Sequence, residues 1–151
     1  MASGTKIEPA IILLIEDNPV DVLMTKEAFR CARVCNNLHV AEDGEEALDF
    51  LHRRGKYSSA PRPDLILLDL NLPRKDGREV LAEIKGDPAL HHIPVIILTP
   101  SESQEDVWNS HELQASYFIT KPLDMDQFTK ALECIGELWL TLVKLPSPPK
   151  P

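Results

Sequence analysis

The sequence lacks several features that mark whole classes of protein. No run of about eighteen apolar residues occurs in its 151 residues, so nothing in it is long enough to span a bilayer. The first six residues contain no apolar signal core, which predicts a cytoplasmic protein. Basic residues are few, with 16 Lys and Arg against 24 Asp and Glu and a net charge of −8. This balance argues against non-specific nucleic-acid binding and against a polybasic membrane contact.

Cysteine is also scarce. The three cysteines, Cys31, Cys35 and Cys134, are odd in number and fall in segments expected to be helical. Cys31 and Cys35 would share one helix face if the first helix extended that far. We interpret the cysteines as small packing residues in a reducing compartment, which is favoured over the alternative of a metal or redox site.

Five short apolar runs stand out in what remains, and each ends at a polar residue. Short continuous runs separated by helix-length segments predict a parallel sheet that is buried on both faces. The alternation implies an α/β fold with right-handed crossovers and helices on both sides of the sheet. The length and a hydrophobic content of 43% suit one domain with its own core. The runs are residues 11–15, 38–40, 65–68, 95–98 and 117–119.

The composition divides the chain into three parts. Residues 1–9 predict a short polar tail, residues 10–140 the folded domain, and residues 141–151 a proline-rich extension. Within the domain, Asp17 or Asn18 could cap the first helix. The second apolar run ends in Glu42 and Asp43, which are interpreted as helix-capping residues with a structural role only.

Polar residues follow the other four runs where the strands end. Glu16 and Asp17 follow the first run, Asp69 the third, Thr99 the fourth and Lys121 the fifth. The carboxyl ends of parallel strands lie along one edge of the sheet, where open α/β folds place their ligand sites. These distant residues are therefore expected to meet.

Three carboxylates in one place need cations. Two carboxylates about 4 Å apart repel by roughly 4 kcal/mol at an effective dielectric constant near 20. Lys121 together with Mg²⁺, or Mn²⁺, would bring the site close to neutral and let it accept a phosphoryl group. Asp69 is the preferred nucleophile, because it ends the most apolar central strand, whereas the adjacent Glu16 and Asp17 favour shared metal binding.

These strand-end residues resemble the receiver domain of two-component response regulators. The matching motifs are IEDN (15–18), LDLNLP (68–73) with DG (76–77), LT (98–99) and TKP (120–122), and the resemblance covers about residues 10–140. It implies a flavodoxin-like (βα)5 three-layer sandwich whose five-stranded parallel sheet has the order 2-1-3-4-5. It also implies a signalling domain rather than an enzyme, which receives a phosphoryl group on Asp69 from a sensor histidine kinase.

The resemblance also implies how the metal is held. Mg²⁺ would be bound by Asp17, Asp69 and the main-chain carbonyl of Asn71, and Glu16 would assist through water. Glu16 replaces the commoner Asp of the acidic pair, which lengthens one arm and should shift its metal contact toward water.

The same resemblance implies a phosphoryl-sensing group. Thr99 would swing to the phosphoryl group, Lys121 would contact a phosphoryl oxygen, and Phe118 would turn inward when Thr99 moves. Pro122 is a candidate for a cis peptide bond. Pro100 departs from the family pattern, because Pro fixes φ and removes an N–H donor beside Thr99.

Two alternative functions remain open in the sequence. One is an Mg²⁺-dependent phosphatase with an aspartyl nucleophile, but such enzymes usually have an acidic residue where this chain has Asn71. The other is a pseudo-receiver that only binds partners, which Glu16 and Pro100 would favour.

The last helix is expected to run from about residue 124 into the low 140s and to exceed what the sheet needs. Its exposed apolar end predicts either a tail that folds back on its own domain or an interface with a second copy. The homodimer would use the fourth helix, the fifth strand and the fifth helix. Residues 135–146 are similar to the extension of cyanobacterial phytochrome response regulators, which implies a phytochrome-type kinase as partner. The interface candidates are Phe128, Leu138, Trp139 and Leu142.

Overall fold

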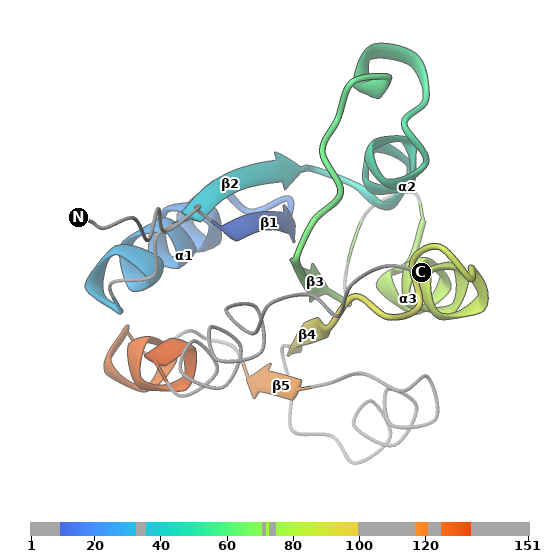
Figure 1. Ribbon diagram of the computed structural model, residues 1–151. Coiled ribbons are helices and arrows are strands. Elements are labelled where there is room, and N and C mark those ends of the chain that lie inside the picture. The colour runs from blue at the N-terminus through green and yellow to red at the C-terminus, as the bar shows by residue number, and fades with distance from the viewer. Residues whose placement is uncertain are drawn as a thin grey trace, which may run out of the picture.

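The apolar runs form the strands of one parallel sheet. The computed structural model describes residues 10–32, 36–70, 72, 75–99, 117–120 and 125–133. The sheet has the order β2-β1-β3-β4-β5, as the resemblance implied, and all four neighbouring pairs are parallel (Figure 1). The strands are β1 (Ala10–Ile15), β2 (Asn36–Ala41), β3 (Leu65–Asp69), β4 (Val95–Thr99) and β5 (Tyr117–Thr120).

The central strands are apolar up to their carboxyl ends because both faces of the sheet are covered. Successive side chains of a strand point to opposite faces. One core cluster therefore contains Leu13, Ile66 and Leu68, whereas the other contains Ile12 and Leu67. Each fully buried Leu or Ile stabilises the fold by about 1.5–3 kcal/mol.

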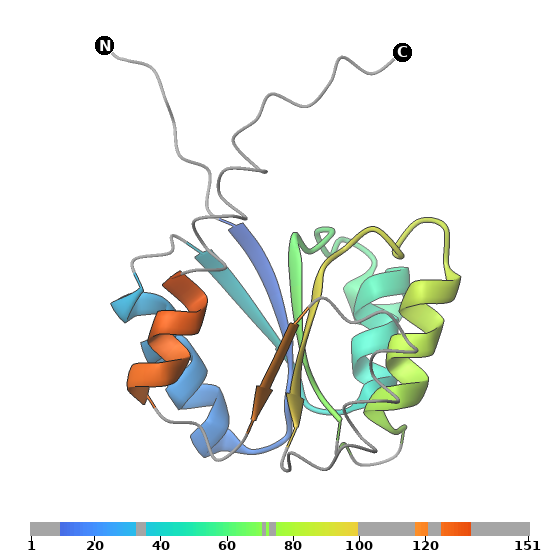
Figure 2. The same cartoon turned by 90° about the horizontal axis from the view of Figure 1, so that it is seen from below.

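The helices lie in two layers on either side of the sheet (Figure 2). α2 (Gly44–His52) and α3 (Gly77–Gly86) cover one face, and a short 3-10 helix, η1 (Gly55–Tyr57), follows α2. α1 (Pro19–Cys31) and the helical residues 125–133 cover the other face. The predicted three-layer α/β architecture is confirmed.

Side-chain caps define where the first two helices begin. The Asn18 side chain accepts hydrogen bonds from the Val20 and Asp21 N–H groups, and Pro19 occupies the first helical turn. Of the two candidates at this end, Asn18 is thus the cap. Asp43 caps α2 by accepting from the Glu46 N–H at 2.8 Å, as predicted.

The structure defines two positions that the sequence left open and corrects one expectation, that of Phe128 as an interface residue. α1 ends at Cys31, with Ala32 as its C-cap, so it does not extend to Cys35. Asp64 lies directly before β3, and its side chain accepts from the Ile11 N–H at 2.9 Å. Phe128 is 1% exposed and belongs to the core cluster of Phe29 and Leu132, so it has no free surface for a second copy.

Several expected elements lie outside the described residues. These are the tail 1–9, the fourth helix near 103–113, the fifth helix beyond residue 133 and the extension 141–151. Among the helices that the structure describes, none is long and apolar enough to cross a membrane.

Candidate functional site

The register of the sheet brings the strand ends to one level. Ile15 of β1 is paired with Leu68 of β3, so Glu16 follows at the height of Asp69. Asp69 is itself paired with Leu98 of β4, the residue before Thr99. Residues from three separate parts of the chain therefore end at the same edge, as the apolar runs predicted.

Three carboxylates converge at this edge. Glu16, Asp17 and Asp69 each place one carboxylate oxygen within 4.8 Å of the others. Glu16 is 1% exposed and Asp69 4% exposed, whereas Asp17 faces solvent. The predicted meeting of these residues is confirmed, and their role as metal ligands stays a prediction.

The charge of this cluster suits a hard divalent cation. At 4.8 Å, each pair of ionised carboxylates repels by about 3 kcal/mol at an effective dielectric constant near 20. Carboxylate oxygens are the ligands that Mg²⁺ prefers, and Mg²⁺ keeps several waters when it binds. The open side at Asp17 leaves room for such waters, so these donors fit Mg²⁺ or Mn²⁺.

The longer side chain of Glu16 folds back toward α1. Its Oε2 accepts a hydrogen bond from the Asn18 N–H at 3.2 Å, and its own N–H donates to the Ala41 carbonyl at 2.9 Å. Glu16 is thereby tied to the cap of α1 and to the end of β2. Its expected indirect contact with the metal stays a prediction.

Asp69 is held firmly at the end of β3. Every residue of β3 is buried. The next residue, Leu70, donates its N–H to the Leu98 carbonyl at 3.2 Å and accepts at its carbonyl from the Gly77 N–H at 3.1 Å. The loop that follows Asp69 is therefore closed at its base by main-chain hydrogen bonds.

The structure gives partial information on the other predicted residues. The backbone of Thr99 ends β4 and that of Phe118 lies in β5, paired with Ile97, but their side chains are outside the described part of the chain. The predicted residues for which no structure is described are Asn71, Pro100, Lys121, Pro122, Leu138, Trp139 and Leu142.

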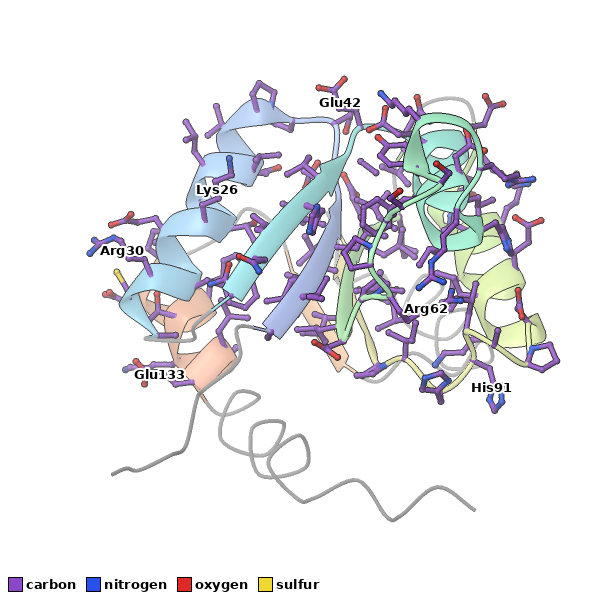
Figure 3. All side chains as sticks on the ribbon, turned by 45° about the horizontal axis from the view of Figure 1, so that its top comes forward. Lys26, Arg30, Glu42, Arg62, His91 and Glu133 are labelled. Carbon is purple, nitrogen blue, oxygen red and sulfur yellow. The ribbon has the colours of Figure 1, made fainter. Side chains whose placement is uncertain are left out.

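An open groove beside the cluster was not expected from the sequence. It has a volume of about 740 Å³ and extends from the acidic residues along α1. Figure 3 shows Lys26 on α1 and Glu42 at the carboxyl end of β2. Glu42 and Asp43 thus belong to the surroundings of the site, and not only to the helix cap. The lining residues are Glu16, Asp17, Pro19, Val22, Leu23, Lys26, Val40, Glu42 and Asp43.

Apolar side chains stand exposed on the α1 side of this groove. Val20 is 61% exposed and Leu23 66% exposed. They are the large apolar residues that stand out to solvent among the described side chains. The first turns of α1 carry them next to Asp17, which suits contact with another protein.

Comparisons with known proteins agree with this geometry. A family model of the response regulator receiver domain matches residues 12–133. The chain is 44% identical over 139 residues to response regulator Rcp1 of Synechocystis sp.. The aligned region covers 92% of this chain and 95% of Rcp1.

Two solved structures are similar in fold as well as in sequence. The phosphorylated cyanobacterial phytochrome response regulator RcpA has a TM-score of 0.82 at 44% identity, over 93% of this chain and 100% of that one. The Mn²⁺-bound form of Rcp1 has a TM-score of 0.80 at 44% identity, over 92% of this chain and 100% of that one. The match of the family model, residues 12–133, includes all three carboxylates.

Proposed function

Because this chain belongs to the response regulator receiver domain family, we propose that it takes up a phosphoryl group on Asp69 from a sensor histidine kinase. The observation that carries this proposal is the cluster of Glu16, Asp17 and Asp69, with carboxylate oxygens within 4.8 Å of one another. Asp69 is the member at the end of the central strand, and an aspartyl carboxylate is an established phosphoryl acceptor.

The transfer is a displacement at phosphorus. A carboxylate oxygen of Asp69 attacks the phosphorus, a P–O bond forms, and the P–N bond of a phosphohistidine breaks. The electron pair of that bond goes to the imidazole nitrogen of the donor. Mg²⁺ or Mn²⁺, when bound by Asp17, Asp69 and the carbonyl of Asn71, supplies the positive charge that offsets the carboxylates and the phosphoryl oxygens.

The neighbours of Asp69 serve mainly to position it. Transfer of this kind depends chiefly on alignment and on charge compensation. The hydrogen bonds at Leu70 fix the strand end, and Glu16 adds negative charge from a buried position. Thr99 and Lys121 complete the proposal as residues that contact the phosphoryl group, with Phe118 as the aromatic residue that responds.

The two alternatives are less well supported. A phosphatase of the aspartyl class would be expected to have an acidic residue at position 71, where this chain has Asn. A pseudo-receiver would be expected to lack part of the acidic cluster, and here all three carboxylates converge.

A phosphorylation assay tests the proposal. The protein is incubated with Mg²⁺ and acetyl phosphate, and a base-labile, acid-resistant adduct is expected in the wild type and absent in Asp69→Asn. Asp64→Asn is the matched control, because Asp64 precedes the same strand at the opposite edge of the sheet. An adduct that persists in Asp69→Asn would refute the assignment, and steady hydrolysis of generic phosphate esters would favour the phosphatase.

The pathway and the assembly belong to the same proposal. Similarity to Rcp1 and RcpA supports a phytochrome-type histidine kinase as the phosphodonor, acting in the cytoplasm. The sequence of the last helix supports a homodimer through Leu138, Trp139 and Leu142. Light scattering on wild type and Trp139→Glu tests the dimer, and a monomeric mass for the wild type would contradict it.

A further inference from the structure

The first turn of α2 lies in very close contact with the loop that follows Asp69. A Cβ atom built on Gly44 would be 2.6 Å from the Lys75 carbonyl oxygen, 2.8 Å from the Lys75 Cβ and 2.8 Å from a methyl carbon of Val80. Real Cβ atoms essentially never come within 3.0 Å of such atoms. Two of the three contacts involve the backbone oxygen and Cβ of Lys75, which cannot move without moving the loop.

The far end of the same loop approaches Asp69 equally closely. A Cβ atom on Gly77 would be 2.5 Å from the Asp69 carbonyl oxygen and 2.6 Å from the Leu70 Cα. The Gly77 N–H also donates to the Leu70 carbonyl at 3.1 Å. Lys75 thus lies tightly against the start of α2, and Gly77 lies tightly against the end of β3.

Two further contacts hold Leu72 and Lys75 in place. Leu72 packs against the core cluster that contains Val80 and Leu81. The Lys75 ammonium forms an ion pair with Glu83 of α3 at 3.2 Å. A displacement of Lys75 would therefore be passed to Gly77, two residues further on, which lies against Asp69.

We propose that Gly44 is a positioning residue for the metal site. Its missing side chain lets the first turn of α2 pack directly against Lys75, and this contact holds the short segment from Lys75 to Gly77 against Asp69. The inference rests on the proposed function, because Asp69 is the proposed phosphoryl acceptor and a proposed metal ligand. It adds a residue from α2, an element that supplies no ligand of its own.

The test compares the Mn²⁺ affinity of wild type and Gly44→Ala, measured by calorimetry on the full chain. The variant should bind about tenfold more weakly, at the lower end of the effect of outer-shell changes at metal sites. Its rate of phosphorylation by acetyl phosphate should recover at saturating Mg²⁺, which a general loss of folded protein would not allow. Equal affinities in the two proteins would overturn the role of Gly44 alone, whereas no Mn²⁺ binding by the wild type would overturn the metal site as well.

Two control variants separate positioning from stability. Gly86→Ala adds the same methyl group at the end of α3, where a Cβ would meet nothing within 4 Å, and it should leave the affinity unchanged. Ala28→Gly weakens the buried side of α1 on the other face of the sheet, and it should lower stability without changing the affinity. A loss of affinity in either control as large as in Gly44→Ala would contradict the proposal.

A compensating change gives a further readout. Val80→Ala removes one of the three atoms that the new methyl group would meet, so Gly44→Ala/Val80→Ala should regain part of the lost affinity. If neither variant folds, hydrogen exchange on the wild type decides. Mg²⁺ should then slow exchange of the Ala47 amide, which bonds to the Asp43 carbonyl in the first turn of α2. Unchanged exchange at Ala47 would overturn the proposal.

Discussion

Glu16 follows β1 and Asp69 ends β3, and each holds a carboxylate oxygen within 4.8 Å of the other's. Both side chains are almost fully buried, so water screens their charges poorly. The proximity of these two carboxylates therefore favours the binding of a cation. The burial of two of its three members distinguishes this cluster from an ordinary set of surface acids.

Replacing Glu16 with Gln should raise the melting temperature of the metal-free protein and reduce the stabilisation that Mg²⁺ provides. Without metal, Glu16→Gln removes repulsion inside the cluster, so the melting temperature should rise. Addition of Mg²⁺ should raise the melting temperature of Glu16→Gln by less than it raises that of the wild type, because weaker binding stabilises the native state less. Thermal unfolding with and without Mg²⁺ measures both effects.

Glu42→Gln is the matched control for that measurement. Glu42 lines the neighbouring groove but is outside the three-carboxylate cluster. Its Mg²⁺-dependent stabilisation should equal that of the wild type. If Mg²⁺ raises the melting temperature of Glu16→Gln as much as that of the wild type, Glu16 has no part in metal binding.

The substitution Leu23→Asp should slow phosphorylation by a histidine kinase but not phosphorylation by acetyl phosphate. Leu23 is exposed beside the groove that leads to the cluster, so Leu23→Asp should leave stability within about 0.5 kcal/mol of the wild type. Transfer from a histidine kinase that phosphorylates the wild type should slow by about tenfold, which corresponds to about 1.4 kcal/mol of lost contact. Phosphorylation by acetyl phosphate should be unchanged, because a small donor needs no docking surface.

The control for charge is Ala89→Asp. Ala89 is exposed near the amino end of β4, at the opposite edge of the sheet. The rates of phosphorylation of Ala89→Asp by the kinase and by acetyl phosphate should both match those of the wild type. A kinase reaction that is equally fast in Leu23→Asp would show that α1 takes no part in docking.

Tyr57 offers a pH-dependent test of the α2 surface. Burial first, and then a hydrogen bond to Glu46, raise the pKa of Tyr57 to about 12 from its usual 10.0. A group with a raised pKa stabilises the fold below its ordinary pKa, and the contribution is lost as the pH rises through the folded value. Stability should therefore fall between about pH 10 and pH 12.

Glu46→Gln should lower the pKa of Tyr57 but leave it above 10.0, because burial, the largest cause, remains. The absorbance of tyrosinate measures this pKa, and Tyr57→Phe identifies the signal. The ring of Tyr57 lies 5.3 Å from that of Phe50, so the phenylalanine variant should keep the packing. The same high pKa in Glu46→Gln would rule out the contribution of the carboxylate.

The sequence predicted those parts of the fold that depend on continuous apolar runs. The edge of the sheet where Glu16 and Asp69 meet was among them, because a buried parallel strand needs apolar side chains on both faces. The strand order and the ligand roles came from resemblance to a known family, and the order is confirmed. The choice between Asp17 and Asn18 as cap needed coordinates, because either side chain can accept from the first turn.

Features that depend on distances across the fold could not be predicted. Gly44 and Gly77 resemble ordinary turn and helix-start residues in the sequence, and only the structure places them against Lys75 and Asp69. Phe128 fits the pattern of both a core and an interface residue, because both are apolar. The groove beside α1 depends on how far α1 stands from the end of β2, which no local pattern encodes.

The central claim is that Asp69 carries the phosphoryl group, and chemical trapping tests it most directly. The wild type is treated with acetyl phosphate and Mg²⁺ and then reduced with borohydride, which converts an aspartyl phosphate to homoserine. Peptide mass spectrometry should find homoserine at position 69 and unmodified aspartate at positions 17 and 64. Homoserine at position 17, or none at any aspartate, would contradict the account.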